Sequence, residues 1–177
     1  LRWLRARAHA ELTQSEQAIT EFDAVAEAGH ALSPWATLAA ARLALDGQGT
    51  ERRLALLANL PHDFPGAWDA TVLRARAGLT NADRSRAREA LGRAIAHAPR
   101  GADSTAAELV YAGELVRSEF AADQEAAFRI YRRLGVAQPA TAVGRQASSA
   151  EAELLAAWPE DRRALHRELS PTEQLDL

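Results

Sequence analysis

A short pattern that recurs every 34 to 40 residues constrains the fold of this chain more than any other feature. Residues 87–99 read AREALGRAIAHAP, and residues 127–139 read AFRIYRRLGVAQP. In both segments a small residue is followed by a large apolar residue four positions later and by another apolar residue three further on. A proline stands five positions after that. Steps of four and three keep the apolar side chains on one helix face, and the proline ends the helix.

The pattern begins at four places in the chain. The starts at residues 18, 53, 87 and 127 lie 35, 34 and 40 residues apart. His30 replaces the proline of the first copy, and Arg53 replaces the small residue of the second. An alanine stands twelve residues ahead of each of the first three starts, at Ala6, Ala41 and Ala75. A period in this range is typical of stacked helical hairpins.

These signals predict at least eight helices in antiparallel pairs and no β-strand. The apolar content of 47% includes only 6% aromatic residues, so strand-forming side chains are scarce. Thr13 and Glu16 have the spacing of a capping box. The predicted pairs are residues 1–12 with 15–28, 34–46 with 50–60, 66–79 with 83–97, and 104–119 with 123–136. A fifth pair, 141–157 with 160–169, fits the period less closely.

Two copies carry the full series of small, large, apolar and proline positions: Ala87, Leu91, Ala94 and Pro99, then Ala127, Tyr131, Leu134 and Pro139. With partner-helix alanines such as Ala75, these residues resemble the signature of the tetratricopeptide repeat family. The match covers residues 1–139 and extends loosely to 169. It departs from the family at Arg53, at Gly78, where an aromatic residue is usual, and in the 40-residue step. The resemblance implies an all-α, right-handed superhelix of antiparallel helix pairs with a concave groove.

The domain organisation that follows is a single repeat domain over residues 1–169. Ser170, Pro171 and Glu173 have the signature of a helix start. We therefore expect residues 170–177 to begin a further helix that is truncated here.

A second resemblance concerns the alanine-rich, irregular hairpins and phrases such as LANLPHDFPGAWDA (57–70). These are similar to the U-shaped superhelical region of bacterial soluble lytic transglycosylases. That region is non-catalytic and helps to shape the enzyme around peptidoglycan. The resemblance implies peptidoglycan as a partner that is reached through an attached domain.

Composition narrows the classes of partner and the cellular setting. The net charge of −3 gives no electrostatic basis for binding nucleic acid. No stretch approaches the roughly 20 apolar residues that span a bilayer, so we expect no membrane span. All 21 basic residues are arginine, which indicates a GC-rich bacterial genome. Cysteine is absent, which excludes disulfides and leaves both the bacterial periplasm and the cytoplasm open.

The sequence carries no motif of catalysis or of a cofactor site. It has no HExxH, no P-loop and no dinucleotide-binding glycine pattern. The charged run EDRRALHREL (160–169) is typical of a solvated helix face. The histidines are isolated in sequence and are typical of surface or interhelix positions. They are His9, His30, His62, His97 and His166. We expect no catalytic residue, metal ligand or cofactor here, and we expect that this chain is not itself an enzyme.

One column of residues suggests a binding surface. Each of the three partner-helix alanines is followed by an arginine, which gives Arg7, Arg42 and Arg76. In the repeat family this column faces the concave groove and often contacts a bound peptide. The alternative is ordinary ion pairing within the helix, Arg7 with Glu11 and Arg42 with Asp46, four residues on.

The predicted function is a non-enzymatic helical-repeat scaffold that binds a protein or peptide on its concave face. Trp3, Trp35 and Trp68 recur near the starts of successive partner helices. They either pack between repeats or give the groove an aromatic lining. The alternative function is the non-catalytic superhelical region of a peptidoglycan lytic transglycosylase.

Overall fold

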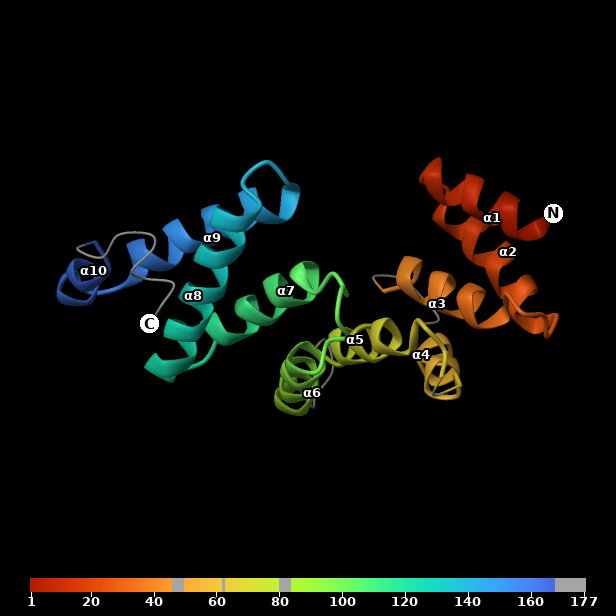
Figure 1. Cartoon of the computed structure of the whole chain (residues 1–177), viewed down its shortest axis with the longest axis horizontal. Coiled ribbons are helices and arrows are strands. Elements are labelled where there is room, and N and C mark those ends of the chain that lie inside the picture. Colours follow the sequence, from red (N-terminus) through yellow and green to blue (C-terminus); the bar gives the residue numbers. More distant parts are fainter. Residues whose placement is uncertain (46–49, 62, 80–83, 168–177) are drawn as a thin grey trace. The chain divides into compact units, whose positions relative to one another are not determined.

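The computed structural model of the chain describes residues 1–45, 50–61, 63–79 and 84–167, and its regular structure over these residues is entirely helical (Figure 1). No β-strand occurs within these ranges, which confirms the predicted all-α class. The helices are α1 (Arg2–Glu11), α2 (Ser15–Glu27), α3 (Ser33–Leu43), α4 (Thr50–Ala58), α5 (Ala67–Gly78), α6 (Arg84–Ala96), α7 (Thr105–Val116), α8 (Ala121–Ala137), α9 (Ala142–Ala157) and α10 (Glu160–Arg167). Each predicted helix is present within a few residues of its predicted ends.

The helices group into two compact units, Leu1–Pro99 and the chain from Arg100 onward. In the first unit each helix from α1 to α6 packs on the next, and α3 also contacts α5. In the second unit α8 packs on both α7 and α9, and α7 also contacts α9. Contacts of α3 with α5 and of α7 with α9 join the first helices of successive pairs, as a helical repeat requires.

The fold is therefore compatible with a helical repeat. The right-handed superhelix and the single domain over residues 1–169 stay predictions. The helix start predicted at residues 170–177 lies outside the described residues.

The predicted apolar stripes form the cores of both units. The exception is Leu60, the second apolar position of the copy that starts at Arg53, which lies beyond the end of α4 and is only partly buried. The other apolar members are at most 8% exposed, and the large ones each stabilise the fold by about 1.5–3 kcal/mol through burial. The partner-helix alanines at positions 6, 41 and 75 are buried against them, which lets paired helices approach closely. The stripe residues are Ala18, Phe22 and Val25 on α2, Leu57 on α4, Ala87, Leu91 and Ala94 on α6, and Ala127, Tyr131 and Leu134 on α8.

Two departures from the repeat pattern have a physical reason. The Arg53 side chain is only 18% exposed, and its Nη2 donates to Oδ2 of Asp23 on α2 at 2.7 Å. This ion pair ties α4 to α2 where a small residue would normally stand. At Gly78, an added Cβ would lie 2.9 Å from the Cβ of Ala87. The α5–α6 pair is too close at this point for any side chain, so the aromatic residue usual in the family cannot fit.

The capping box predicted at Thr13 and Glu16 is wrong. Thr13 adopts a left-handed backbone with φ of 59°, whereas an N-cap residue is typically extended. Its hydroxyl donates to the carbonyl of Leu12 at 2.7 Å, and Gln14 occupies the N-cap position without a side-chain cap. The connection between α1 and α2 is so short that Thr13 is used to turn the chain.

Candidate functional site

A groove of about 290 Å³ opens between α1 and α3 in the first unit. Its position follows from the repeat, because α1 and α3 are the first helices of successive pairs and α2 forms the floor between them. The bottom of the groove is apolar because the side chains of Phe22 and Leu38 form it, and both are almost fully buried. The residues that line the groove are Trp3, Arg7 and Ala10 of α1, Phe22 of α2, and Trp35, Leu38, Ala39, Arg42 and Leu43 of α3.

Two of the three arginines predicted from the sequence line this groove. Arg7 reaches it from α1 and Arg42 from α3, so equivalent positions of two repeats contribute to one cavity. Arg76 lies on α5, is half-buried, and is not among the lining residues. The structure thus brings Arg7 and Arg42 together and leaves Arg76 outside the groove.

The two groove arginines differ in their partners. Nη2 of Arg42 lies 2.8 Å from Oδ1 of Asp69, an acidic residue in the first turn of α5. Both side chains are partly solvated, with 53% of Arg42 and 38% of Asp69 exposed. Arg7 is exposed, and it makes no ion pair with Glu11 or with any other residue in the described ranges. Asp46, the intrahelical partner considered for Arg42, lies outside those ranges.

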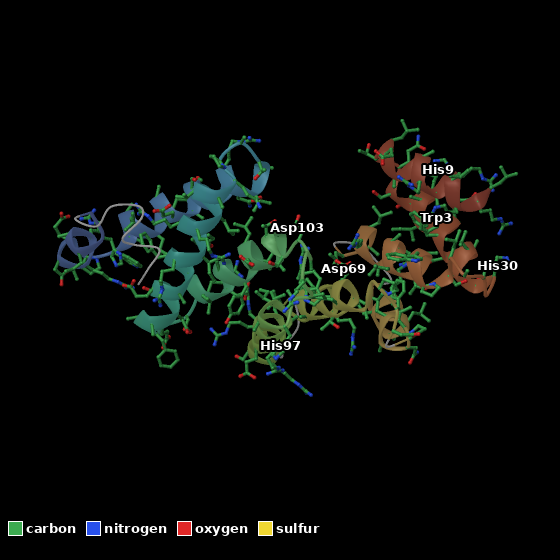
Figure 2. All side chains as sticks on the ribbon, viewed as in Figure 1. Trp3, His9, His30, Asp69, His97 and Asp103 are labelled. Atoms are coloured by element: carbon green, nitrogen blue, oxygen red, sulfur yellow. The ribbon has the colours of Figure 1, made fainter. Side chains whose placement is uncertain are left out.

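Aromatic side chains form two walls of the groove. The ring of Trp3 packs edge-on against Phe22, with centroids 5.2 Å apart. Trp35 packs in the same way against Phe64, with centroids 4.7 Å apart, yet 40% of Trp35 remains exposed. Each of these tryptophans packs against a phenylalanine and also lines the groove, and the contact of Trp3 with Phe22 lies within one helix pair, α1 with α2. Figure 2 shows Trp3 and Asp69 among the side chains of this unit.

Trp68, the third tryptophan of the series, has a different environment. Its Nε1 donates to the carbonyl of Ala94 at 2.8 Å, which joins α5 to α6. This contact lies within one predicted helix pair and not between repeats, and Trp68 is absent from the groove lining.

The histidines do not belong to a metal-binding cluster within the described residues. No group of three or more His, Asp or Glu side chains there could hold a metal ion. The Nδ1 of His9 lies near Gln14, and the Nδ1 of His97 lies 2.8 Å from the carbonyl of Arg93. Figure 2 labels both rings. His62 lies outside the described residues.

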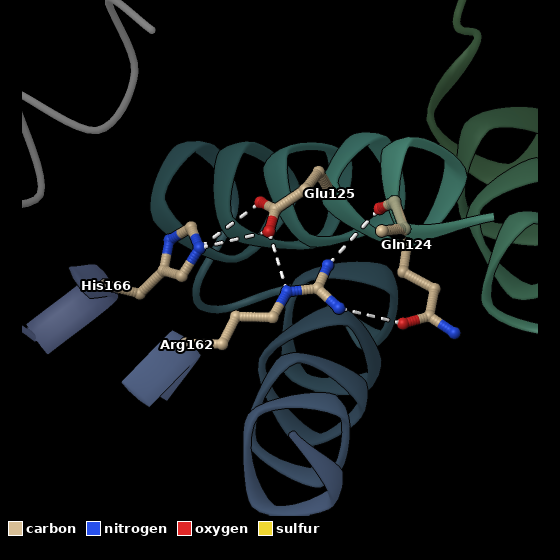
Figure 3. Close-up of polar contacts among 5 residues, drawn as sticks. Gln124, Glu125, Arg162 and His166 are labelled. Atoms are coloured by element: carbon tan, nitrogen blue, oxygen red, sulfur yellow. Dashed lines mark hydrogen bonds and ion pairs between the residues drawn. The ribbon is translucent and has the colours of Figure 1, made fainter. Parts of the chain in front are cut away.

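The second unit contains a polar cluster between α8 and α10 (Figure 3). Arg162 donates from all three guanidinium nitrogens: Nε to Glu125 at 2.8 Å, Nη1 to Gln124 at 3.0 Å, and Nη2 to the carbonyl of Ala121 at 3.2 Å. The Nε2 of His166 lies 3.2 Å from the second oxygen of Glu125. Each nitrogen of this guanidinium thus makes at least one hydrogen bond within the chain.

Aromatic rings enclose this cluster. The guanidinium of Arg162 lies 3.6 Å from the ring centroid of Trp158, and the His166 ring packs against both Trp158 and Phe128. Only 20% of the Arg162 side chain and 17% of the His166 side chain are exposed. The prediction of a solvated face for the run at 160–169 is therefore wrong for these two residues, because they attach α10 to α8.

The sequence did not indicate the pairing of Asp69 with Arg42, and it indicated Phe22 only as a member of a buried stripe. Asp69 follows Trp68 in the first turn of α5, where an acidic residue is explained by the helix dipole alone. Its ion pair with Arg42 joins residues 27 positions apart, so no local spacing could have indicated it.

Comparisons with known proteins add no name to this arrangement. No family model matches the chain, and no curated protein or solved structure is significantly similar to it. Within the described residues, no helix combines the length and the apolar character needed to cross a membrane.

Proposed function

We propose that this chain is a non-enzymatic helical-repeat scaffold that binds a segment of a protein or peptide in the groove between α1 and α3. The single observation that carries the proposal is that Arg7 and Arg42, at equivalent positions of two repeats, line one groove. In the tetratricopeptide-like superhelix that we propose for the chain, this groove belongs to the concave face. Helical-repeat arrays commonly present such a surface to their partners.

The lining favours a ligand that combines carboxylates with apolar side chains. An arginine guanidinium presents a planar fork that matches a carboxylate with two parallel hydrogen bonds. The buried floor at Phe22 and Leu38 and the open ring of Trp35 offer apolar contact beside that charge. An extended acidic segment with an apolar side chain satisfies both parts of the groove.

Arg76 extends the proposal by one repeat. It occupies the same column on α5, so a ligand longer than the groove would reach it next. Arg76→Ala therefore tests the length of the binding surface, whereas Arg7→Ala and Arg42→Ala test its centre.

The experiment is selection from a displayed library of random peptides on the immobilised chain. We expect the recovered peptides to be enriched in Asp and Glu next to apolar residues. Fluorescence anisotropy with a synthetic recovered peptide should show an affinity loss of about tenfold or more for the Arg7→Ala/Arg42→Ala variant. Raising the salt from about 0.1 M to 1 M should also weaken binding, because the Debye length falls from about 10 Å to 3 Å.

The matched control is Arg93→Ala, which removes an exposed arginine of α6 that pairs only weakly with Glu89, at 3.6 Å. This variant should bind like the wild type. Failure to recover any peptide, or equal binding by the double variant and the wild type, would contradict the proposal. Binding of soluble peptidoglycan fragments in place of a peptide would favour the transglycosylase-like alternative.

A further inference from the structure

The ion pair between Arg42 and Asp69 places a carboxylate of the chain itself on one of the two groove arginines. The distance from Nη2 to Oδ1 is 2.8 Å, and the two residues come from different helices, α3 and α5. Asp69 is not itself a lining residue. It therefore engages Arg42 from outside the groove, and its ion pair occupies part of a guanidinium that lines the groove.

The pair is accessible to exchange. With 53% of Arg42 and 38% of Asp69 exposed, water can solvate both charges when they separate. Ion pairs with this degree of exposure contribute little net stability, so breaking one has a small cost. A carboxylate that arrives with additional apolar contacts can replace Asp69, whereas an isolated anion gains little over the internal partner.

We infer that Asp69 is an internal competitor that lowers the affinity of the groove for acidic ligands and thereby sets its selectivity. The inference rests on the proposed function, since it assigns a role to a residue beside that same groove. Arg7, with no ion-pair partner in the described ranges, offers the first charge to the ligand. Arg42 becomes available only when its ion pair with Asp69 breaks. An isolated anion therefore binds Arg7 alone, whereas an acidic segment that also makes apolar contacts binds both arginines.

A second interhelix pair in the same unit supplies a matched control. Asp23 on α2 accepts from Arg53 on α4 at 2.7 Å, and its exposed fraction of 36% is close to that of Asp69. Neither Asp23 nor Arg53 lines the groove. The arginine of this pair is less exposed than Arg42, at 18% against 53%, so only the acidic residues are matched. Asp23→Asn therefore removes the same unit of negative charge from another interhelix pair without freeing a groove arginine.

The test uses the whole chain and the peptide recovered in the selection experiment. A second peptide carries Asn and Gln in place of every Asp and Glu. We expect Asp69→Asn to raise affinity for the acidic peptide by about two- to fivefold, the range that a partly exposed ion pair permits. Affinity for the amide peptide should stay unchanged, and Asp23→Asn should change neither. In the Arg42→Ala background, Asp69→Asn should have no effect on the acidic peptide.

Three results would overturn the inference. Weaker binding in Asp69→Asn would make Asp69 a positioning residue that orients Arg42 for the ligand. An equal gain in Asp23→Asn would reduce the effect to net charge, and an unchanged affinity in Asp69→Asn would leave Asp69 without influence. If Arg42→Ala weakens binding while any of these occurs, the proposed function survives and only the inference fails. Circular dichroism of each variant verifies that the helices remain folded.

Discussion

The two units combine the same kinds of residue with opposite results. In the first unit, Trp35 and Arg42 are 40% and 53% exposed, and the arginine has Asp69 as its ion-pair partner. In the second unit, Trp158 and Arg162 are 5% and 20% exposed, and the guanidinium makes three hydrogen bonds and stacks on the indole ring. A guanidinium whose three nitrogens all donate within the chain helps to hold the fold together. One with a single solvated partner remains available to a ligand.

We expect the largest difference between the two units in the stability that is lost when Trp158 or Trp35 is replaced. Trp158→Ala should destabilise the chain by about 3–5 kcal/mol, because it removes a buried ring and leaves a cavity next to Phe128. Trp35→Ala should cost only about 1 kcal/mol, since much of that ring is already in water. Urea unfolding monitored by circular dichroism measures both. Equal losses would remove the distinction between a structural and an available tryptophan.

A smaller difference is expected for two arginines with acidic partners. Glu108 on α7 is 7% exposed and accepts from Arg133 at 2.6 Å and from Ser104 at 2.6 Å. Arg133→Ala should cost about 1–3 kcal/mol, because a buried carboxylate loses its charged partner. Arg42→Ala should cost less than about 1 kcal/mol, since water can replace the arginine at Asp69. A larger loss in Arg42→Ala than in Arg133→Ala, in the same unfolding assay, would show that the exposed pair is structural.

The smallest predicted effect is a pH dependence in the second unit. Burial raises the pKa of Glu151 above its ordinary value, although Arg132, at 2.9 Å, offsets part of the shift. The Glu151 carboxyl therefore keeps its proton to a higher pH in the folded state than in the unfolded state. Its contribution to the free energy of unfolding falls as the pH rises through and above 4.5. Between about pH 4 and pH 6, the range in which carboxyl groups ordinarily titrate, the free energy of unfolding should therefore fall less in Glu151→Gln than in the wild type.

Urea unfolding at a series of pH values measures this slope. Glu153→Gln, on the same helix, controls for the loss of one charge. A steeper loss of stability with rising pH in Glu151→Gln than in the wild type would contradict the assigned direction.

Local spacing was sufficient to predict the helices and the buried stripes, because steps of three and four residues report directly which side chains share a helix face. The column of arginines also led to Arg7 and Arg42, which line one groove, but its third member, Arg76, lies outside that groove. Spacing could not indicate which arginines would find partners. Asp69 and Glu125 are 27 and 37 positions from Arg42 and Arg162, so their pairing depends on how whole helices pack. Thr13 was misassigned because the length of the turn, and not the capping preference, determines its backbone.

The functional proposals all depend on the binding of a ligand in the groove between α1 and α3. The most direct test is a nitrogen-15 NMR titration of the chain with the selected acidic peptide, monitored at the four indole N–H groups and assigned with Trp→Phe variants. We expect the resonances of Trp3 and Trp35 to shift together and to saturate at the measured affinity. Those of Trp68, bonded to the carbonyl of Ala94, and of buried Trp158 should stay in place. Shifts at Trp68 or Trp158 with none at Trp3 and Trp35 would contradict binding in this groove.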